Sequence, residues 1–388
     1  MTSNEAVFVN NERFMKGRMS YDFNILTCLK VCIDEHASDL WKTHSNLTII
    51  TGDYFKCTGG VSSPDPCIVF YCLSKGFIPI DEEPFPTELT FRMGTLKTDV
   101  REGYFTLGPT TMRGYPDSFN DPICMGSNIG NQCRDASGSL GLFVDLPNNG
   151  KGFLTCCHVL FDCVKPREFS YSHIYDNEVQ HVIQPGKSAF CSNTDTACGE
   201  ILQAKFCPGR SPVSVDAALV KVNRRIPLTG HFVIKTVPQV KEIGYDLDAL
   251  PVFDTGRARR KISKHDLEKP LLKSGTSSGL NRSLFRLDGA QVRIIEEGAW
   301  LGMDEQLPIT MKGQYEVESG SKEPGSLNKP FFIPGDSGSA VFAKENDGTL
   351  TCIGIAIGIT SYGTTVVTPI GAVLDALNLK DTDVTTFS

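Results

Sequence analysis

From about residue 130 the chain is a succession of short apolar segments with no long helix between them, which limits the folds available to it. The segments are GSLGLFVDL, KGFLTCCHVL, DAALVKVN, AQVRII, GSAVFA and LTCIGIAIGITSYG. Many of the 36 glycines and 22 prolines lie between segments of this kind, where they favour turns. Strands this short and numerous favour a barrel or a sandwich. We therefore expect a mainly β protein, with a late helix in TPIGAVLDALNL.

The first 112 residues predict a smaller α/β module. Between Asn24 and Lys42, apolar residues recur three or four positions apart, which is typical of an amphipathic helix. Two strands, NLTIITGDYFKC and PCIVFYCLSKGF, and a further extended segment, LKTDVREGYF, follow. We expect residues 1–112 to form an accessory domain and residues 113–388 to form the β domain.

The charge balance and the hydropathy exclude some partners. A formal net charge of -7 argues against a nucleic-acid-binding protein, since contact with phosphates requires clustered Lys and Arg. The basic run from Arg257 to Lys261 favours a solvated loop over an anion site. The start of the sequence lacks the apolar core of a signal peptide, and no segment is long enough to span a bilayer. We expect a protein of the cytosol or nucleus, without a membrane or nucleic-acid partner.

The 14 cysteines have irregular spacings over a long chain, which favours reduced thiols over a disulfide framework. Cys156, Cys157 and His158 are adjacent and raise the question of a metal site. No cysteine pair has the two-residue spacing of a zinc knuckle. We expect no metal and no cofactor, and stoichiometric zinc on elemental analysis would contradict this.

A turn flanked by glycines, in KPFFIPGDSGSAVF (residues 329–342), contains a candidate nucleophile, Ser337. A serine hydroxyl becomes nucleophilic when a base takes its proton and a third group orients that base. The glycines allow a sharp backbone path that leaves the N–H groups of Gly335 and Ser337 free to hold an oxyanion. A plain β-turn is the alternative interpretation.

His158 and Asp216 are the candidates for the base and the orienting group. His158 ends the apolar strand GFLTCCHVL, and Asp216 begins the apolar run DAALVKV. A carboxylate at the mouth of a buried strand needs a donor, and an imidazole N–H would serve. Asp195, in a polar loop, is a second candidate, and Asp162 is too close to His158 along the chain. Taken singly, His158 could be a structural imidazole and Asp216 a strand-start cap.

Together, FLTCCHVL, DAALVKV and PGDSGSAVF, in the order His, Asp, Ser, resemble the catalytic segments of the chymotrypsin-like (trypsin-fold) serine proteases. The resemblance implies two six-stranded antiparallel β-barrels, at about 130–225 and 226–377, with the site in the cleft between them. It implies that His158 is the general base, that Asp216 orients it and that Ser337 is the nucleophile. The backbone N–H groups of Gly335 and Ser337 match the oxyanion hole.

Two more stretches resemble non-secreted members of this class. LLKSGTSSGLNRSLFRL is similar to the hairpin that opens their second barrel, and PCIVFYCLSKGFIPIDEEPFPTEL with TDVREGYF is similar to the segment before their protease domain. The sequence lacks the Ile-Val-Gly-Gly activation site of the secreted enzymes. In those enzymes a freed amino terminus pairs with the Asp of GDSG, so Asp336 needs another partner here or stays solvated.

The resemblance also places a substrate pocket beside KPFF and IAIGITSYG, with Phe331, Ile357 and Gly358 in its walls. Phe331 stands where secreted trypsins carry an acidic residue. The pattern therefore disfavours cleavage after Lys or Arg and favours an apolar or small side chain.

These segments together predict an intracellular serine endopeptidase that hydrolyses proteins or peptides through an acyl-enzyme. The alternative is a protease-fold binding or scaffold protein with a closed or inactive cleft. The N-terminal domain could gate the cleft, bind a partner protein or build a homo-oligomer.

Overall fold

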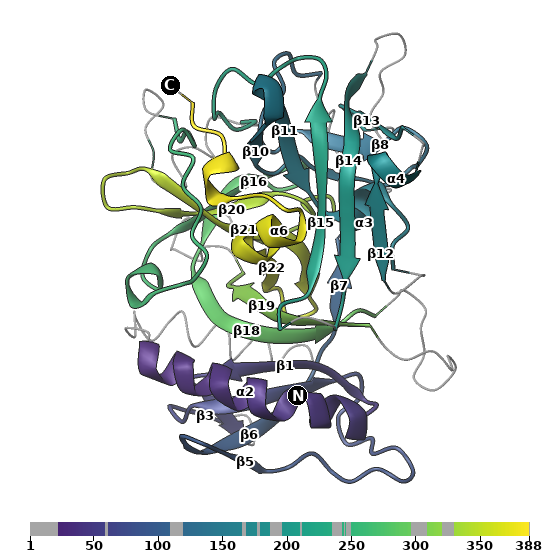
Figure 1. Cartoon of the computed structure of the whole chain (residues 1–388). Coiled ribbons are helices and arrows are strands. Elements are labelled where there is room, and N and C mark those ends of the chain that lie inside the picture. Colours follow the sequence, from purple (N-terminus) through teal and green to yellow (C-terminus); the bar gives the residue numbers. More distant parts are fainter. Residues whose placement is uncertain are drawn as a thin grey trace.

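The structure is a computed structural model. It describes residues 22–58, 61–108, 119–164, 168–176, 179–186, 196–209, 212–234, 243, 245, 250–295, 309–319 and 330–387. This part of the chain is mainly β, in two large curled sheets (Figure 1). The predicted fold class is confirmed, because both sheets have the strand order of a chymotrypsin-like double barrel.

The first barrel follows residue 127. Its strands are β8 (Asn128–Asn131), β9 (Ser137–Ser139), β10 (Phe143–Leu146), β11 (Gly150–Thr155), β12 (Phe169–Ser172), β13 (His181–Ile183), β14 (Ala197–Cys207) and β15 (Val215–Val222). They pair in the order β10-β11-β15-β14-β13-β8-β9, and β12 pairs with β14. Only residues 140–142 separate β9 from β10, so these two act as one bent strand. Within the described residues the sheet thus closes as a barrel of six strands, with β12 added.

The second barrel closes in the same way. Its strands are β16 (Leu271–Gly275), β17 (Gly279–Ser283), β18 (Phe285–Arg293), β19 (Thr310–Val317), β20 (Ala340–Lys344), β21 (Leu350–Thr360) and β22 (Thr365–Pro369). The order is β17-β16-β20-β21-β22-β19-β18, and a single residue, Leu284, separates β17 from β18. A C-terminal helix, α6 (Ile370–Ala376), follows β22 where the sequence predicted one.

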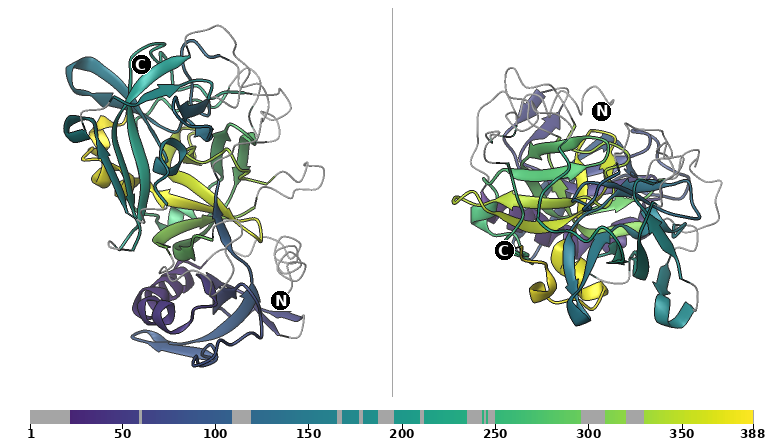
Figure 2. Two further views of the ribbon diagram at one scale, coloured as in Figure 1. Left: turned by 90° about the vertical axis from the view of Figure 1, so that its right-hand side faces the viewer. Right: turned by 90° about the horizontal axis from the view of Figure 1, so that it is seen from above.

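Residues 22–108, called the N-terminal module below, extend the sheet of the second barrel. The module contains α2 (Phe23–Thr43), β1 (Leu47–Asp53), β2 (Lys56–Thr58), β3 (Val61–Ser63), β4 (Cys67–Cys72), β5 (Glu88–Phe91), β6 (Gly94–Glu102) and β7 (Phe105–Leu107). β1 pairs with β18 through Ile49 and Val292, and β4, β6 and β5 continue the sheet outward. The module therefore forms a layer beneath the second barrel (Figures 1 and 2).

Helix α2 follows the predicted stripe and covers this extension. Asp22 caps its start by accepting the backbone N–H of Asn24 at 2.8 Å. Its buried face includes Leu29, Ile33 and Leu40. These side chains belong to one apolar cluster with residues of β1, β4 and the second barrel, so the helix is packed firmly onto the sheet.

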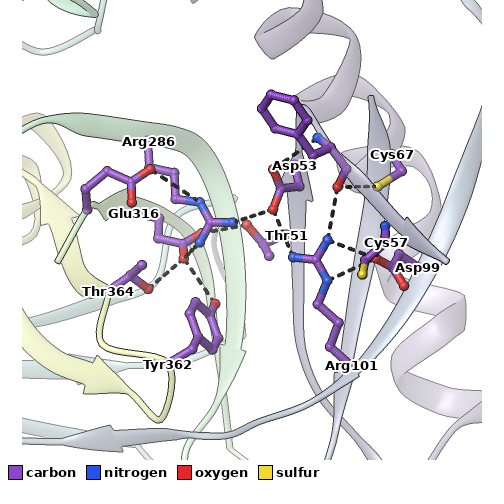
Figure 3. Close-up of polar contacts among 12 residues, drawn as sticks. Thr51, Asp53, Cys57, Cys67, Asp99, Arg101, Arg286, Glu316, Tyr362 and Thr364 are labelled. Atoms are coloured by element: carbon purple, nitrogen blue, oxygen red, sulfur yellow. Dashed lines mark hydrogen bonds and ion pairs between the residues drawn. The ribbon is translucent and has the colours of Figure 1, made fainter. Parts of the chain in front are cut away.

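Buried charges join the module to the barrel (Figure 3). Arg286 of β18 contacts Glu316 Oε1 at 2.7 Å and Asp53 Oδ2 of β1 at 3.2 Å. Asp53 Oδ2 also accepts Arg101 Nη1 of β6 at 2.9 Å. The hydroxyl of Tyr362 donates to Glu316 Oε1 at 3.0 Å. Burying ions is costly unless each is paired, so these contacts fix the module in one position.

The remaining short elements are α3 (Cys157–Leu160), α4 (His173–Asp176), η1 (Pro147–Asn149), η2 (Lys264–Asp266) and η3 (Asp381–Asp383). The basic run lies in a loop, as predicted, but its side chains are paired: Arg259 contacts Asp266 and Glu345, and Arg260 contacts Asp375 and Asp381. The described cysteines are all free thiols. Among the described helices, none is both long and apolar enough to cross a membrane.

Candidate active site

His158 and Asp216 are brought together by the pairing of two strands of the first barrel. β11 ends at Thr155, just before His158 in α3, and it pairs with β15 through Thr155 and Ala218. The backbone N–H of His158 donates to Asp216 Oδ1 at 3.1 Å, and His158 Nδ1 is hydrogen-bonded to Asp216 Oδ2. A carboxylate accepts a hydrogen bond, so in the neutral imidazole the proton lies on Nδ1 and Nε2 keeps its lone pair.

Ser337 lies in the turn that leads into β20. The flanking Gly335 and Gly338 have φ values of 105° and 91°, which glycine adopts without strain. A Cβ at Gly338 would lie 3.2 Å from the backbone nitrogen of Cys156, so this turn packs against the end of β11, near His158. The Ser337 hydroxyl donates to the carbonyl of Ile357 at 3.1 Å, and His158 Nε2 has no hydrogen-bond partner among the described residues.

Gly335 already holds a carbonyl oxygen. Its backbone N–H donates to the carbonyl oxygen of Gly108 at 2.6 Å, and the N–H of Gly108 donates to the carbonyl of Ile357 at 3.2 Å. Gly108 follows β7, which pairs with β21. A segment of the N-terminal module therefore lies beside Ser337, and Ser337, His158 and Asp216 are all buried.

Asp336 has found a partner that the sequence did not identify. Lys273 Nζ of β16 lies 2.9 Å from Asp336 Oδ2, and both side chains are fully buried. The backbone N–H groups of Ser277 and Ser278 donate to Asp336 Oδ1 at 2.8 and 3.0 Å. Burial alone would raise the pKa of Asp336, but Lys273 and these donors outweigh it and hold that pKa below its usual value. Asp336 is therefore a carboxylate.

The residues predicted to line the pocket lie at the same place but leave little room. Phe331 and its neighbour Phe332 are fully buried. Ile357 contributes the carbonyl described above, and Gly358 pairs with Leu107 of β7. A Cβ at Gly358 would lie 2.6 Å from the Phe105 ring, so the missing side chain makes space for β7.

Two groups of side chains at this site have potential metal-ligand atoms within 4.8 Å of one another. They are Cys156, His158 and Asp216, and Cys157, Cys163 and Asp216. Burial raises the pKa of all three thiols. Asp216, which both groups share, already accepts hydrogen bonds from the backbone N–H and the imidazole of His158.

No family model and no curated protein matches the sequence. Among solved structures, similar chains include Protease A of Thermobifida fusca (15% identity, 66% of this chain and 97% of that chain, TM-score 0.38). A glutamic acid-specific serine protease (15%, 66% and 98%, 0.36) and a chymotrypsin of Cellulomonas bogoriensis (15%, 66% and 97%, 0.36) are similar too. At these TM-scores the likeness carries no weight of its own, and the fold assignment stands on the strand order.

Two residues at the site were missed by reasoning from the sequence: Lys273 and Gly108. A signal for Lys273 was present, since a lysine inside the apolar strand LLKSG needs a buried anion. No pattern in the sequence indicated that Gly108 would reach the nucleophile. Asp195, the second candidate for the orienting group, lies outside the described residues.

Proposed function

We propose that the protein is a serine endopeptidase that hydrolyses peptide bonds through an acyl-enzyme. One arrangement carries the proposal: the turn with Ser337 packs against the end of β11, two residues before a carboxylate-bound imidazole with an unpaired Nε2, and Gly335 holds a carbonyl oxygen. Base, nucleophile and oxyanion donor are the three groups that acyl transfer requires.

In the proposed reaction, rotation about χ1 takes the Ser337 hydroxyl from the Ile357 carbonyl to His158 Nε2. Oγ then bonds to the substrate carbonyl carbon as Nε2 accepts its proton, and the oxyanion is held by Gly335 N–H. The C–N bond breaks when the imidazolium returns that proton to the amine. Water attacks the acyl-enzyme by the same route, and Asp216 stabilises the imidazolium in both halves.

We also propose that the protein works in a reducing compartment, the cytosol or nucleus. The free thiols of the described cysteines support this setting, since closely placed pairs such as Cys157 and Cys163 remain unbridged. The substrates would be proteins or peptides.

A fluorophosphonate probe tests the proposal, because it forms a stable bond with an activated serine oxygen. We expect labelling at Ser337, located by peptide mass spectrometry: slow in the wild type, whose own segment covers the nucleophile, and faster in the displaced variant described below. Ser337→Ala and His158→Ala should abolish it, while Ser63→Ala, at an exposed position, should label normally. Labelling that persists in Ser337→Ala would contradict the assignment.

A protease-fold binding protein is the second candidate function, and one observation favours it. The Ser337 hydroxyl is bonded to Ile357 rather than to His158, and the chain's own segment fills the cleft. A binding protein would leave Ser337 unlabelled even after that segment is displaced. The displaced variant described below therefore separates the two functions.

A further inference from the structure

The segment from Phe105 to Gly108 occupies the free edge of β21. β20 pairs with β21 only as far as Ile355, opposite Ala340, which leaves the edge beyond it open. There β7 pairs antiparallel with β21, Leu107 opposite Gly358 and Thr106 opposite Ile359. Addition of an extended peptide to an open strand edge is a common mode of peptide recognition.

The carbonyl group of Gly108, at the end of this segment, lies where a substrate carbonyl attacked by Ser337 would lie. The oxygen of Gly108 is 2.6 Å from the backbone nitrogen of Gly335, the range for an oxyanion donor. A Cβ built on Gly108 would lie 3.1 Å from Ser337 Oγ, so the hydroxyl is close to this residue. The bond presented to Ser337 is therefore the one between Gly108 and Pro109.

The residue at this position has no room for a side chain. A Cβ at Gly108 would overlap the ring of Phe332. That ring cannot easily retreat, because Phe332 is fully buried in the apolar cluster that also contains α2 and β1. Asn281 Nδ2 holds the adjacent turn by donating to the carbonyls of Pro330 and Phe331, at 3.2 and 3.1 Å.

Other contacts keep the segment in place. The Ile295 N–H donates to the Phe105 carbonyl at 3.3 Å, on the side away from β21. Just upstream, the Ser361 N–H donates to the Tyr104 carbonyl at 2.8 Å. Since β6 of the anchored module leads directly into β7, the segment binds at the high effective concentration of an intramolecular ligand.

We propose that this cleft is selective for extended peptides with glycine at the residue whose carbonyl faces Ser337. The chain's own Phe-Thr-Leu-Gly segment occupies the cleft as a built-in competitor. The proposal rests on the proposed function for the identity of the attacked carbonyl. The sequence predicted cleavage after a residue with an apolar or small side chain. The proposal restricts that residue to glycine.

Binding to an inactive protein tests this selectivity without any turnover. The full chain carrying Ser337→Ala and Gly108→Ala is titrated into the fluorescein-labelled peptide Gly-Tyr-Phe-Thr-Leu-Gly, and anisotropy is measured. The alanine at position 108 should expel the chain's own segment, because its methyl group overlaps Phe332. We expect the peptide ending in glycine to bind at least about tenfold more tightly than the same peptide ending in alanine.

Two comparisons complete the design. The chain with Ser337→Ala alone, and the chain with Ser337→Ala and Gly150→Ala, should bind the glycine peptide at least about tenfold more weakly than the Gly108 variant. Gly150 has φ -69°, and a Cβ there would lie 3.3 Å from its nearest neighbours, which need to give by only a few tenths of an ångström to admit alanine. Adding Phe332→Leu should bring the alanine peptide closer in affinity to the glycine peptide. Two results would overturn the inference. One is equal binding of the glycine and alanine peptides to the Ser337→Ala, Gly108→Ala protein that keeps Phe332. The other is equal binding of the glycine peptide to proteins with and without Gly108→Ala.

The outcome is separable from that of the proposed function. Selective binding without fluorophosphonate labelling of Gly108→Ala would refute the peptidase and leave the selective cleft standing. Labelling of Ser337 without selective binding would refute the cleft proposal alone.

Discussion

Lys273 Nζ lies 2.9 Å from Asp336 Oδ2, directly beneath the turn that carries Ser337, and both groups are fully buried. In the secreted enzymes that the sequence resembles, a freed amino terminus supplies the positive charge at this point. Here a strand of the second barrel supplies it. The positive charge that pairs with Asp336 in the nucleophile turn therefore comes from the interior of the fold.

Removing this lysine should destabilise the fold. Lys273→Met leaves Asp336 buried without its counterion, which costs about 3 to 5 kcal/mol when a buried pair is broken. Urea unfolding at pH 7 measures the loss. Lys221→Met, at an exposed strand position, is the matched control and should change stability by less than about 0.5 kcal/mol. Equal, small effects of the two changes would contradict the account.

The same variant has a signed pH dependence. In the wild type the pKa of Asp336 is depressed, so its stabilising contribution is present above the ordinary Asp value and lost only as the pH falls below it. In Lys273→Met only the hydrogen-bond donors such as Ser277 and Ser278 still oppose burial, so the pKa of Asp336 rises and protonation relieves the unpaired charge. The difference in unfolding free energy between the two proteins should therefore shrink as the pH falls from 7 to 4, and a constant difference would refute this.

Pro109 should protect the built-in segment from cleavage. The nitrogen of Pro109 is part of a tertiary amide, and its ring carbon takes the place of the amide hydrogen on the leaving group. Wild-type protein should stay intact, whereas Pro109→Ala should cleave itself after Gly108. Intact-mass spectrometry would show a fragment starting at residue 109. That fragment should be absent when Ser337→Ala is added. If the Pro109→Ala chain stays intact although the fluorophosphonate probe labels its Ser337, the Gly108 carbonyl is not the group presented to Ser337.

The joint between module and barrel should depend on Arg286. Arg286→Met leaves Asp53 and Glu316 short of a partner in the interior, with an expected loss of about 3 to 5 kcal/mol in unfolding free energy. Arg92→Met breaks an exposed pair with Glu35 and should cost about 0 to 1 kcal/mol. Chemical denaturation of both variants decides the point, and similar losses would argue against a structural role for the buried network.

Asp216→Asn should affect the rate far more than the fold. An amide can donate to Nδ1 and so favour the wrong imidazole tautomer, and in a Ser-His-Asp site this costs about four orders of magnitude in kcat. The rate is measured on a peptide substrate in the Gly108→Ala background, with thermal melting as the check on folding. A folded variant with an unchanged rate would remove Asp216 from the site.

The sequence predicted what depends on local pattern. Helix α2 and the strands that carry Asp216 and follow Ser337 were expected close to their observed bounds, because periodicity and turn residues mark them. The strand expected to end at His158 stops at Thr155, and His158 lies in the short helix α3. What it missed depends on contacts distant along the chain. β1 pairs with β18, Lys273 pairs with Asp336, and β7, only three residues long, is too short to show any periodicity.

Cleavage profiling of the Gly108→Ala protein on a proteome-derived peptide library tests the central claim most directly. The account predicts cuts after glycine, above all where an apolar residue precedes it, and none when Ser337→Ala is added. Cleavage without a preference for glycine would contradict the proposed selectivity of the cleft. The absence of any cleavage by the folded Gly108→Ala protein would contradict the proposed peptidase activity.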